Sequence, residues 1–410
     1  MRQEKNMLIY FSGKLVPAAC VLFIMIAGVR FLGKSEYGRY NLLFNCINIA
    51  ITFFIGWIQQ SMLRFNSGEH KELNLQLKQF TIYSLASALL ASLCIFFLDW
   101  FYFDEPLLNC FLVSVFTFCF SLFMLYLSYL QSQFRPGRYA INESSFYVIT
   151  TVAIFCIIYF SFPGKMIWFY CAWLAAGISW LAVTVLRSGK VMFEALRSEF
   201  DAPFFKKTFQ YGFIITSWLM ISNLYNVVDR FIIRHFYDYE QVGVYSAVYD
   251  FIYRLTSFAA LPVLLTLHPL IMKTWNEGRD QAALSLVRKA LFLLSMLLVA
   301  ELTGYLIFGD WVFNKFFHLT GDLRILAVPI IISSVLWQAA LFFHKPLELQ
   351  FRQKQMIIGI VISLLANVIL NFTFIPRYGY QSAAYTTLAS TVIYIVYVII
   401  AARLIKKSVV

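Results

Sequence analysis

Long apolar runs separated by short polar gaps divide the whole chain. A helix needs about 20 mostly apolar residues to cross the hydrocarbon core of a bilayer, and runs of about this length recur twelve times in the 410 residues. We therefore expect an all-α integral membrane protein of about twelve transmembrane helices. The runs cover residues 7–29, 41–62, 80–101, 108–130, 145–161, 166–186, 209–233, 244–272, 289–310, 325–344, 355–375 and 381–402.

The charges in the polar gaps predict an orientation. If the N-terminus and every second gap are assigned to one side, that side holds 22 Lys and Arg residues and the other side holds 9. Positive residues are enriched in the cytoplasmic segments of membrane proteins. We therefore expect a multi-pass protein with both its N-terminus and its C-terminus in the cytoplasm.

The longest cytoplasmic gap falls after the sixth apolar run and separates the helices six and six. We expect an N-lobe of helices one to six at residues 1–190, a cytoplasmic linker at 191–208, and a C-lobe of helices seven to twelve at 209–410. Transporters are often built from two duplicated lobes with a binding site between them. The predicted fold is therefore two pseudo-symmetric six-helix lobes.

A short internal repeat supports this division. Gly38 and Tyr40 follow the first apolar run, and Gly243 and Tyr245 follow the seventh. The two Gly-x-Tyr pairs are 205 residues apart, which is half the chain length.

Composition agrees with a bilayer as the solvent. Hydrophobic residues make up 60% of the chain and charged residues 13%, whereas soluble proteins carry about 25% charged residues. The net charge of +12 lies in the gaps and not on one basic face, which argues against nucleic-acid binding. Seven cysteines form no C-x-x-C pair, so we expect buried thiols, no metal site and no cofactor.

Three motifs resemble those of a known family. The segment Arg30–Tyr40 (RFLGKSEYGRY) follows the first helix, and Asp229–Phe231 (DRF) with Val242–Tyr245 (VGVY) is its counterpart in the second half. Asn367–Ala384 carries N-x3-N-x3-I-P-x2-G-x2-S-A-A, with Ser382 where glycine is usual. In this order the motifs resemble those of Wzx-type polysaccharide flippases, which transport O-antigen and capsule units and belong to the multidrug/oligosaccharidyl-lipid/polysaccharide exporter superfamily.

The resemblance implies a MATE-like fold with a central cavity in a bacterial inner membrane. It also implies a polyprenyl-diphosphate-linked oligosaccharide as cargo, such as an O-antigen, capsule or exopolysaccharide unit, flipped by alternating access. The expected partners are this cargo, membrane lipid, and H⁺ or Na⁺ as coupling ion; we expect a monomer. The sugar and the coupling ion stay open.

Charged side chains inside a bilayer are costly and usually face a partner or a water-filled cavity. Five cations are candidates for binding the diphosphate and sugars, and each could instead be an interface anchor or a member of a structural ion pair: Lys14, Arg30, Arg64, Arg230 and Arg254. Arg254 is the foremost of these, because a guanidinium can bind two oxygens of a diphosphate at once. Asp250, one helical turn earlier, is expected to offset its charge.

Three acids are candidates for ion coupling: Asp229, Asp250 and Glu301. Glu301 lies near the middle of the ninth run and is expected to be the deepest carboxylate. It could exchange a coupling proton, or form a protonated interhelical hydrogen bond. Asn367 and Asn371, one turn apart, are expected to join their helix to a neighbour.

Other functions fit the sequence less well. A multidrug exporter of the same superfamily would favour an acid in the first helix for binding cations, where this chain has Lys14. A membrane polysaccharide polymerase or ligase would need a large external loop with catalytic residues, and the predicted external gaps are short. We therefore expect a transporter with no catalytic residues.

Overall fold

The computed structural model describes residues 2–66, 73–160, 162–196 and 200–408. Contacts between residues group the chain into two compact units, Met1–Met220 and Ile221–Val410. The described residues are almost all helical and contain no strand. The expected all-α fold class is confirmed.

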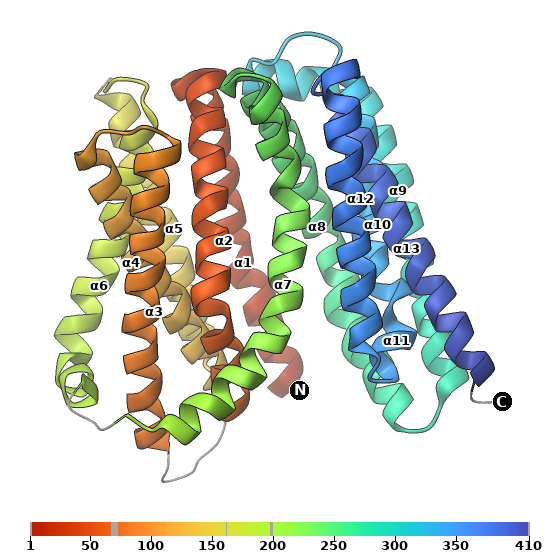
Figure 1. Ribbon diagram of the computed structural model, residues 1–410, viewed down its shortest axis with the longest axis horizontal. Coiled ribbons are helices and arrows are strands. Elements are labelled where there is room, and N and C mark those ends of the chain that lie inside the picture. The colour runs from red at the N-terminus through yellow and green to blue at the C-terminus, as the bar shows by residue number, and fades with distance from the viewer. Residues whose placement is uncertain (1, 67–72, 161, 197–199, 409–410) are drawn as a thin grey trace. The chain divides into compact units, whose positions relative to one another are not determined.

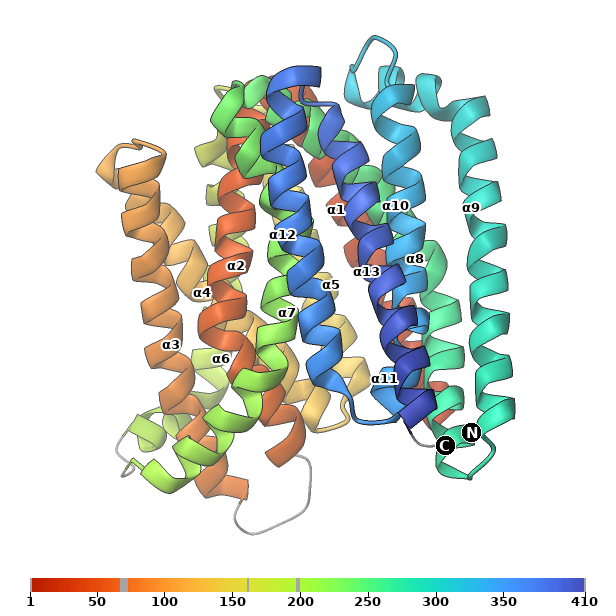
Figure 2. The same cartoon turned by 45° about the vertical axis from the view of Figure 1, so that its right-hand side comes forward.

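The first unit contains six helices and the beginning of a seventh (Figures 1 and 2). In it α1 packs on α5, α3 packs on α4, and α4 packs on α6. Its elements are α1 (Arg2–Ala27), a π-helical turn η1 (Gly28–Leu32), α2 (Gly33–Phe65), α3 (Leu73–Tyr102), α4 (Leu107–Ser132), α5 (Pro136–Tyr159), α6 (Met166–Leu196) and the start of α7 (Ala202–Phe236).

The second unit contains the rest of α7 and five more long helices. In it α12 packs on α13, while α10 contacts α8, α9 and α13. Its elements after α7 are α8 (Tyr239–Asn276), α9 (Asp280–Phe317), α10 (Arg324–Phe343), the short α11 (Lys345–Leu349), α12 (Gln353–Tyr378) and α13 (Ser382–Ser408). Prolines lie inside α8 at Pro262 and Pro269, where each removes a backbone hydrogen bond.

The long helices coincide with the twelve predicted apolar runs, and several begin earlier than expected. The expected loop at 30–40 is instead the end of η1 and the first turns of α2. Tyr40 is buried there; its hydroxyl accepts a hydrogen bond from Trp173 Nε1 at 2.9 Å, and its carbonyl accepts one from Tyr170. This packing holds the polar segment 33–40 in a helix, so the motif around Tyr40 contributes to the core of the first unit.

The Gly-x-Tyr repeat has the same place in each unit. Tyr40 lies in the first turns of α2 and Tyr245 in the first turns of α8, and both rings are buried. The hydroxyl of Tyr40 receives a hydrogen bond, while that of Tyr245 donates one to a carboxylate. The repeat thus marks two equivalent positions whose chemistry has diverged.

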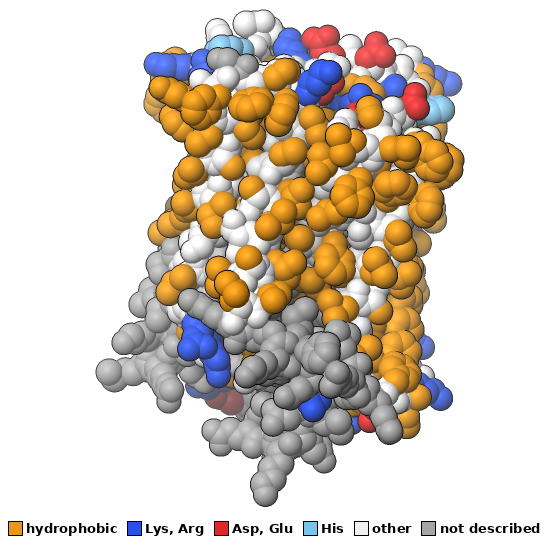
Figure 3. All heavy atoms as spheres, turned by 90° about the vertical axis from the view of Figure 1, so that its left-hand side faces the viewer, with side chains coloured by type: hydrophobic (Ala, Val, Ile, Leu, Met, Phe, Trp, Pro, Cys, Tyr) orange, Lys and Arg blue, Asp and Glu red, His pale blue; other side chains and the backbone are white. Residues whose placement is uncertain are grey.

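The helices carry the apolar surface that a bilayer requires. Ten segments of the described chain are long and apolar enough to span a membrane, and one of them, Gly13–Phe65, runs from within α1 to the end of α2. Figure 3 shows hydrophobic side chains over the middle of one face and charged ones gathered at its upper end. Of the long helices, α7 is missing from these segments, and its second half carries Asn226, Asp229 and Arg230. The chain is a multi-pass membrane protein.

Candidate functional site

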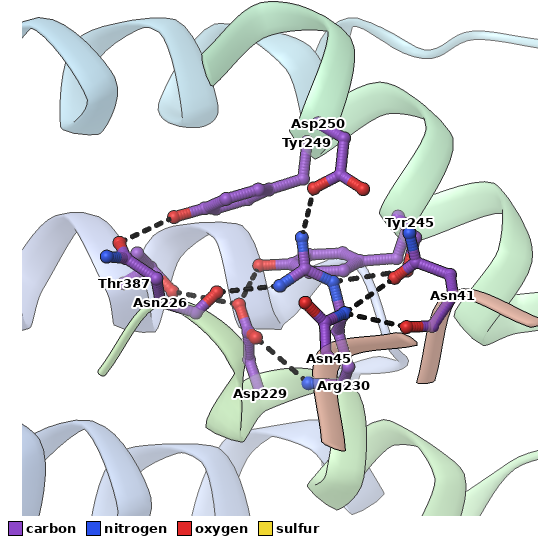
Figure 4. Close-up of polar contacts among 10 residues, drawn as sticks. Asn41, Asn45, Asn226, Asp229, Arg230, Tyr245, Tyr249, Asp250 and Thr387 are labelled. Atoms are coloured by element: carbon purple, nitrogen blue, oxygen red, sulfur yellow. Dashed lines mark hydrogen bonds and ion pairs between the residues drawn. The ribbon is translucent and has the colours of Figure 1, made fainter. Parts of the chain in front are cut away.

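A network of polar side chains lies inside the second unit, between α7 and α8 (Figure 4). Asp229 and Arg230 come from α7, and their side chains are only 1% and 2% exposed. Tyr245, Tyr249 and Asp250 come from α8, where the two tyrosine rings stack with centroids 5.7 Å apart. We call these five residues the α7–α8 network.

Arg230 is held by several groups at once. Its Nη2 donates to Asp250 Oδ1 at 2.5 Å, and its Nη1 donates to the carbonyl oxygen of Asn226 at 2.6 Å. Its Nε donates to Ser246 Oγ at 3.2 Å, and the guanidinium carbon lies 4.7 Å from the centroid of the Tyr249 ring. A buried guanidinium is tolerable in a membrane protein when its donors are satisfied in this way.

Asp229 connects α7 to two other helices. Its Oδ2 accepts hydrogen bonds from the Tyr245 hydroxyl on α8 and from Thr387 Oγ1 on α13, the latter at 3.4 Å. Its Oδ1 accepts the backbone N–H of Arg230 at 2.9 Å. Any change in the charge of this carboxylate therefore acts on the contacts among three helices.

Polar contacts continue between α12 and α13. Asn371 Nδ2 donates to Asn367 Oδ1 at 2.8 Å, and Asn367 Nδ2 donates to Ser390 Oγ at 3.1 Å. Tyr225 on α7 hydrogen-bonds the same Ser390 hydroxyl at 2.8 Å. The expectation that the two asparagines join their helix to a neighbour is confirmed, and that neighbour is α13.

Arg230 bonds Asp250 through its guanidinium and Asp229 through its backbone N–H. Asp229 is 1% exposed, whereas the side chain of Asp250 is 18% exposed. An ionised carboxylate buried as deeply as that of Asp229 is strongly disfavoured without compensation. Within the described residues, no group of three or more His, Cys, Asp or Glu side chains forms a metal cluster.

The carboxylate of Asp250 bonds Arg230, twenty residues earlier on another helix, while the Arg254 side chain, expected to pair with Asp250, is exposed. The i, i+4 spacing permits the intrahelical pair, but a guanidinium buried on the adjacent helix needs the carboxylate more than an exposed one does.

The other predicted cations lie in the first unit. Lys14 Nζ is 2.5 Å from Glu143 Oε1 on α5 and donates to the Tyr139 hydroxyl at 3.0 Å. Arg30 is exposed in the middle of η1. Arg64 lies in the last turn of α2, with its guanidinium carbon 4.4 Å from the centroid of the Tyr211 ring.

Glu301 forms an interhelical hydrogen bond, because its Oε2 accepts Thr256 Oγ1 of α8 at 2.7 Å. Its Oε1 has no hydrogen-bond partner among the described residues, and the side chain lines a pocket of about 350 Å³ together with Tyr305. Glu301 lies near the middle of α9 and is half-buried, whereas Asp99 and Asp229 are 0% and 1% exposed.

Asp99 and Glu143 were not identified from the sequence. Both oxygens of Asp99 and one of Glu143 are buried without hydrogen-bond partners in the described part of the chain. A signal for Asp99 exists: it continues a buried stripe of α3 formed by Ala88, Ser92 and Ile95, at the spacing of one helix face.

Comparisons with known proteins agree with this architecture. A family described as "Polysaccharide biosynthesis protein" matches residues 4–275. No curated protein matches the sequence. The fold is similar to that of the lipid II flippase MurJ in an inward closed conformation, at 15% identity over 97% of this chain and 87% of that one, with a TM-score of 0.70.

Two further solved structures are similar over 98% of this chain. A multidrug resistance MATE family transporter in an inward-facing conformation has 11% identity, a TM-score of 0.74 and 98% of its own chain covered. A MOP superfamily transporter from Pyrococcus furiosus has 12% identity, a TM-score of 0.65 and 95% of its chain covered. The chain thus has the fold of MOP superfamily transporters and belongs to the polysaccharide biosynthesis protein family.

Proposed function

We propose that this protein is a flippase, which moves a polyprenyl-diphosphate-linked oligosaccharide from one leaflet of a bacterial inner membrane to the other. The observation that carries the proposal is the buried α7–α8 network in a chain of this family. Buried charges inside membrane-spanning helices are costly and are usually kept for transport or coupling. The cargo is an O-antigen, capsule or exopolysaccharide unit, moved by alternating access of two lobes.

Arg254 is the proposed diphosphate ligand. Its side chain is exposed, one turn beyond Asp250 on α8, and Asp250 is engaged by Arg230. Its planar fork of donors therefore remains suited to two phosphate oxygens. Lys14 and Arg30 are proposed to contact the sugars or the second phosphate. Arg230 has its donors engaged within the α7–α8 network and is not proposed to contact the cargo.

The ion-coupling step is assigned to the acids of the α7–α8 network. Binding of H⁺ or Na⁺ at Asp229 or Asp250 would reduce the negative charge beside Arg230 and weaken its attraction to these carboxylates. Two internal prolines, Pro262 and Pro269, follow the network along α8. A change in charge at the first turns of α8 can therefore bend this helix at the prolines. Glu301 is a second candidate, through its hydrogen bond from α8.

The orientation follows the charge asymmetry of the gaps, with both termini in the cytoplasm. Reporter fusions after residues 105, 195 and 410 test this arrangement. We expect a periplasmic signal at 105 and cytoplasmic signals at 195 and 410; a periplasmic signal at either of the last two contradicts it.

Transport is tested with the purified full chain in liposomes that contain a fluorescent polyprenyl-diphosphate oligosaccharide in one leaflet. We expect protein-dependent movement to the other leaflet, with the mass of the cargo unchanged. A change in mass would indicate a polymerase or ligase. Export of a cationic dye without movement of the lipid-linked sugar would indicate a multidrug exporter.

A further inference from the structure

A pocket rich in positive charge lies in the first unit, where α2 ends and α7 begins. Arg64 of α2 and the neighbouring Lys206 and Lys207 of α7 line a volume of about 570 Å³. Gln210 and Tyr211 contribute an amide and a hydroxyl to the same wall. Among the described residues that line this basic pocket, none is acidic.

Aromatic rings position two of the three cations. The guanidinium carbon of Arg64 lies 4.4 Å from the centroid of the Tyr211 ring, and Lys207 Nζ lies 5.1 Å from that of Phe65. Each ring attracts a cation through the negative potential of its face. Like charges held close together repel one another, so an anion in the basic pocket would relieve this repulsion.

The walls of the basic pocket are fixed by contacts on the opposite side of α7. Ser61 Oγ donates to the carbonyl oxygen of Thr208 at 2.6 Å, and the ring of Phe205 packs against Trp57 with centroids 5.7 Å apart. Asp201 Oδ1 accepts the backbone N–H of Phe204 at 2.9 Å, so this carboxylate caps the start of α7. The first turns of α7 run obliquely before the helix turns along the bundle (Figures 1 and 2).

The basic pocket also has an apolar side. Ile214 lines it and is 64% exposed, and the adjoining Phe213 is 43% exposed. These side chains lead from the basic pocket onto the apolar surface of α7, where an acyl chain would lie. Positive groups at one end and an apolar surface at the other suit an amphiphile better than a free ion.

We propose that the basic pocket binds the phosphate of an anionic phospholipid, whose acyl chains lie along α7 beyond Ile214. Basic residues at the membrane surface attract anionic lipid headgroups, and pockets of such residues beside transmembrane helices hold these headgroups. Arg64 supplies a planar fork for two phosphate oxygens, while Lys206 and Lys207 act as mobile point charges. This assignment gives Arg64 a lipid ligand in place of the cargo.

The test measures lipid binding and does not depend on transport. The full chain in neutral detergent is titrated with phosphatidylglycerol, with zwitterionic phosphatidylethanolamine, and with inorganic pyrophosphate, and bound lipid is counted by native mass spectrometry. The double variant Lys206→Gln/Lys207→Gln is expected to weaken phosphatidylglycerol binding about 30-fold. Each cation near an anionic surface contributes about 1 kcal/mol of binding free energy, and the variant removes two.

The matched control is Arg288→Gln/Lys289→Gln, an adjacent pair of exposed cations at the start of α9. It removes the same net charge outside the basic pocket and is expected to change binding less than twofold. Both pairs are exposed, so both variants should keep the wild-type circular dichroism spectrum and melting temperature without lipid. Equal weakening by the two variants, absent preference for phosphatidylglycerol, or equally tight binding of pyrophosphate would each overturn the lipid assignment.

Discussion

Replacement of Arg230 by Gln is the most direct test of the α7–α8 network. Arg230 is 2% exposed and makes three hydrogen bonds of 2.5–3.2 Å through Nε, Nη1 and Nη2. Hydrogen bonds to charged groups contribute about 1.5–3 kcal/mol each, and the shorter Gln side chain restores only part of them. Removal of one member of a buried ion pair typically costs about 3–5 kcal/mol, because the other charge is left uncompensated.

We therefore expect Arg230→Gln to lower the free energy of unfolding by about 3–5 kcal/mol. This corresponds to about 150- to 4,000-fold in the unfolding equilibrium constant. Reversible unfolding in mixed micelles of mild and denaturing detergent, followed by circular dichroism, measures the difference. The matched control is Arg234→Gln, one turn further along α7. Its half-buried guanidinium donates to the carbonyl oxygen of Tyr237 at 3.2 Å and stacks on Tyr239. We expect this variant to lose less than about 1 kcal/mol.

A double-mutant cycle with Asp250→Asn isolates the ion pair. If the 2.5 Å contact stabilises the fold, the double variant should be less destabilised than the sum of the single ones by about 2 kcal/mol. Additivity within about 0.5 kcal/mol would refute the coupling. A loss at Arg230 no larger than the loss at Arg234 would refute the argument from burial itself.

Three further predictions address other parts of the chain. Arg254→Lys keeps the charge but not the planar fork, so transport in liposomes should fall at least tenfold while the free energy of unfolding is unchanged. Because Asp250 pairs with Arg230, Arg254→Ala should also fold. Normal transport by both variants would contradict the assignment of Arg254 to the cargo. Glu301→Gln keeps the acceptor for Thr256 but cannot ionise, so the pH dependence of transport should flatten while stability is kept; an unchanged pH profile would leave Glu301 a structural role only. Gly212→Ala should destabilise the fold by about 1–3 kcal/mol by overpacking, because its Cβ would lie 2.1 Å from the carbonyl oxygen of Trp57; Gly137→Ala, where nothing lies within 4 Å, is the neutral control, and equal effects would contradict the close contact of α2 and α7.

The sequence was sufficient for the membrane class and the helices. A bilayer leaves unpaired backbone groups without water, so an apolar segment that spans it alone satisfies its hydrogen bonds as a helix. A run of about 20 apolar residues suffices to identify such a helix. The motifs around Arg30, Asp229 and Asn367 also predicted the family, and the matching of residues 4–275 confirmed it. The prediction for Asn367 and Asn371 of α12 was correct because it required only that they bond a neighbouring helix, without specifying which one.

The partners of the charged residues were decided by the tertiary structure alone. In the sequence, Asp250 has Arg254 as a neighbour one helical turn away. In the fold, Asp250 forms an ion pair with Arg230, because the rotation of α7 brings that guanidinium into the core beside α8. Asp99 was not identified from the sequence, and the packing of α3 buries it completely. Periodicity identifies the face on which a residue lies, but which helix covers that face, and how it is rotated, depends on side-chain packing between segments far apart in the chain.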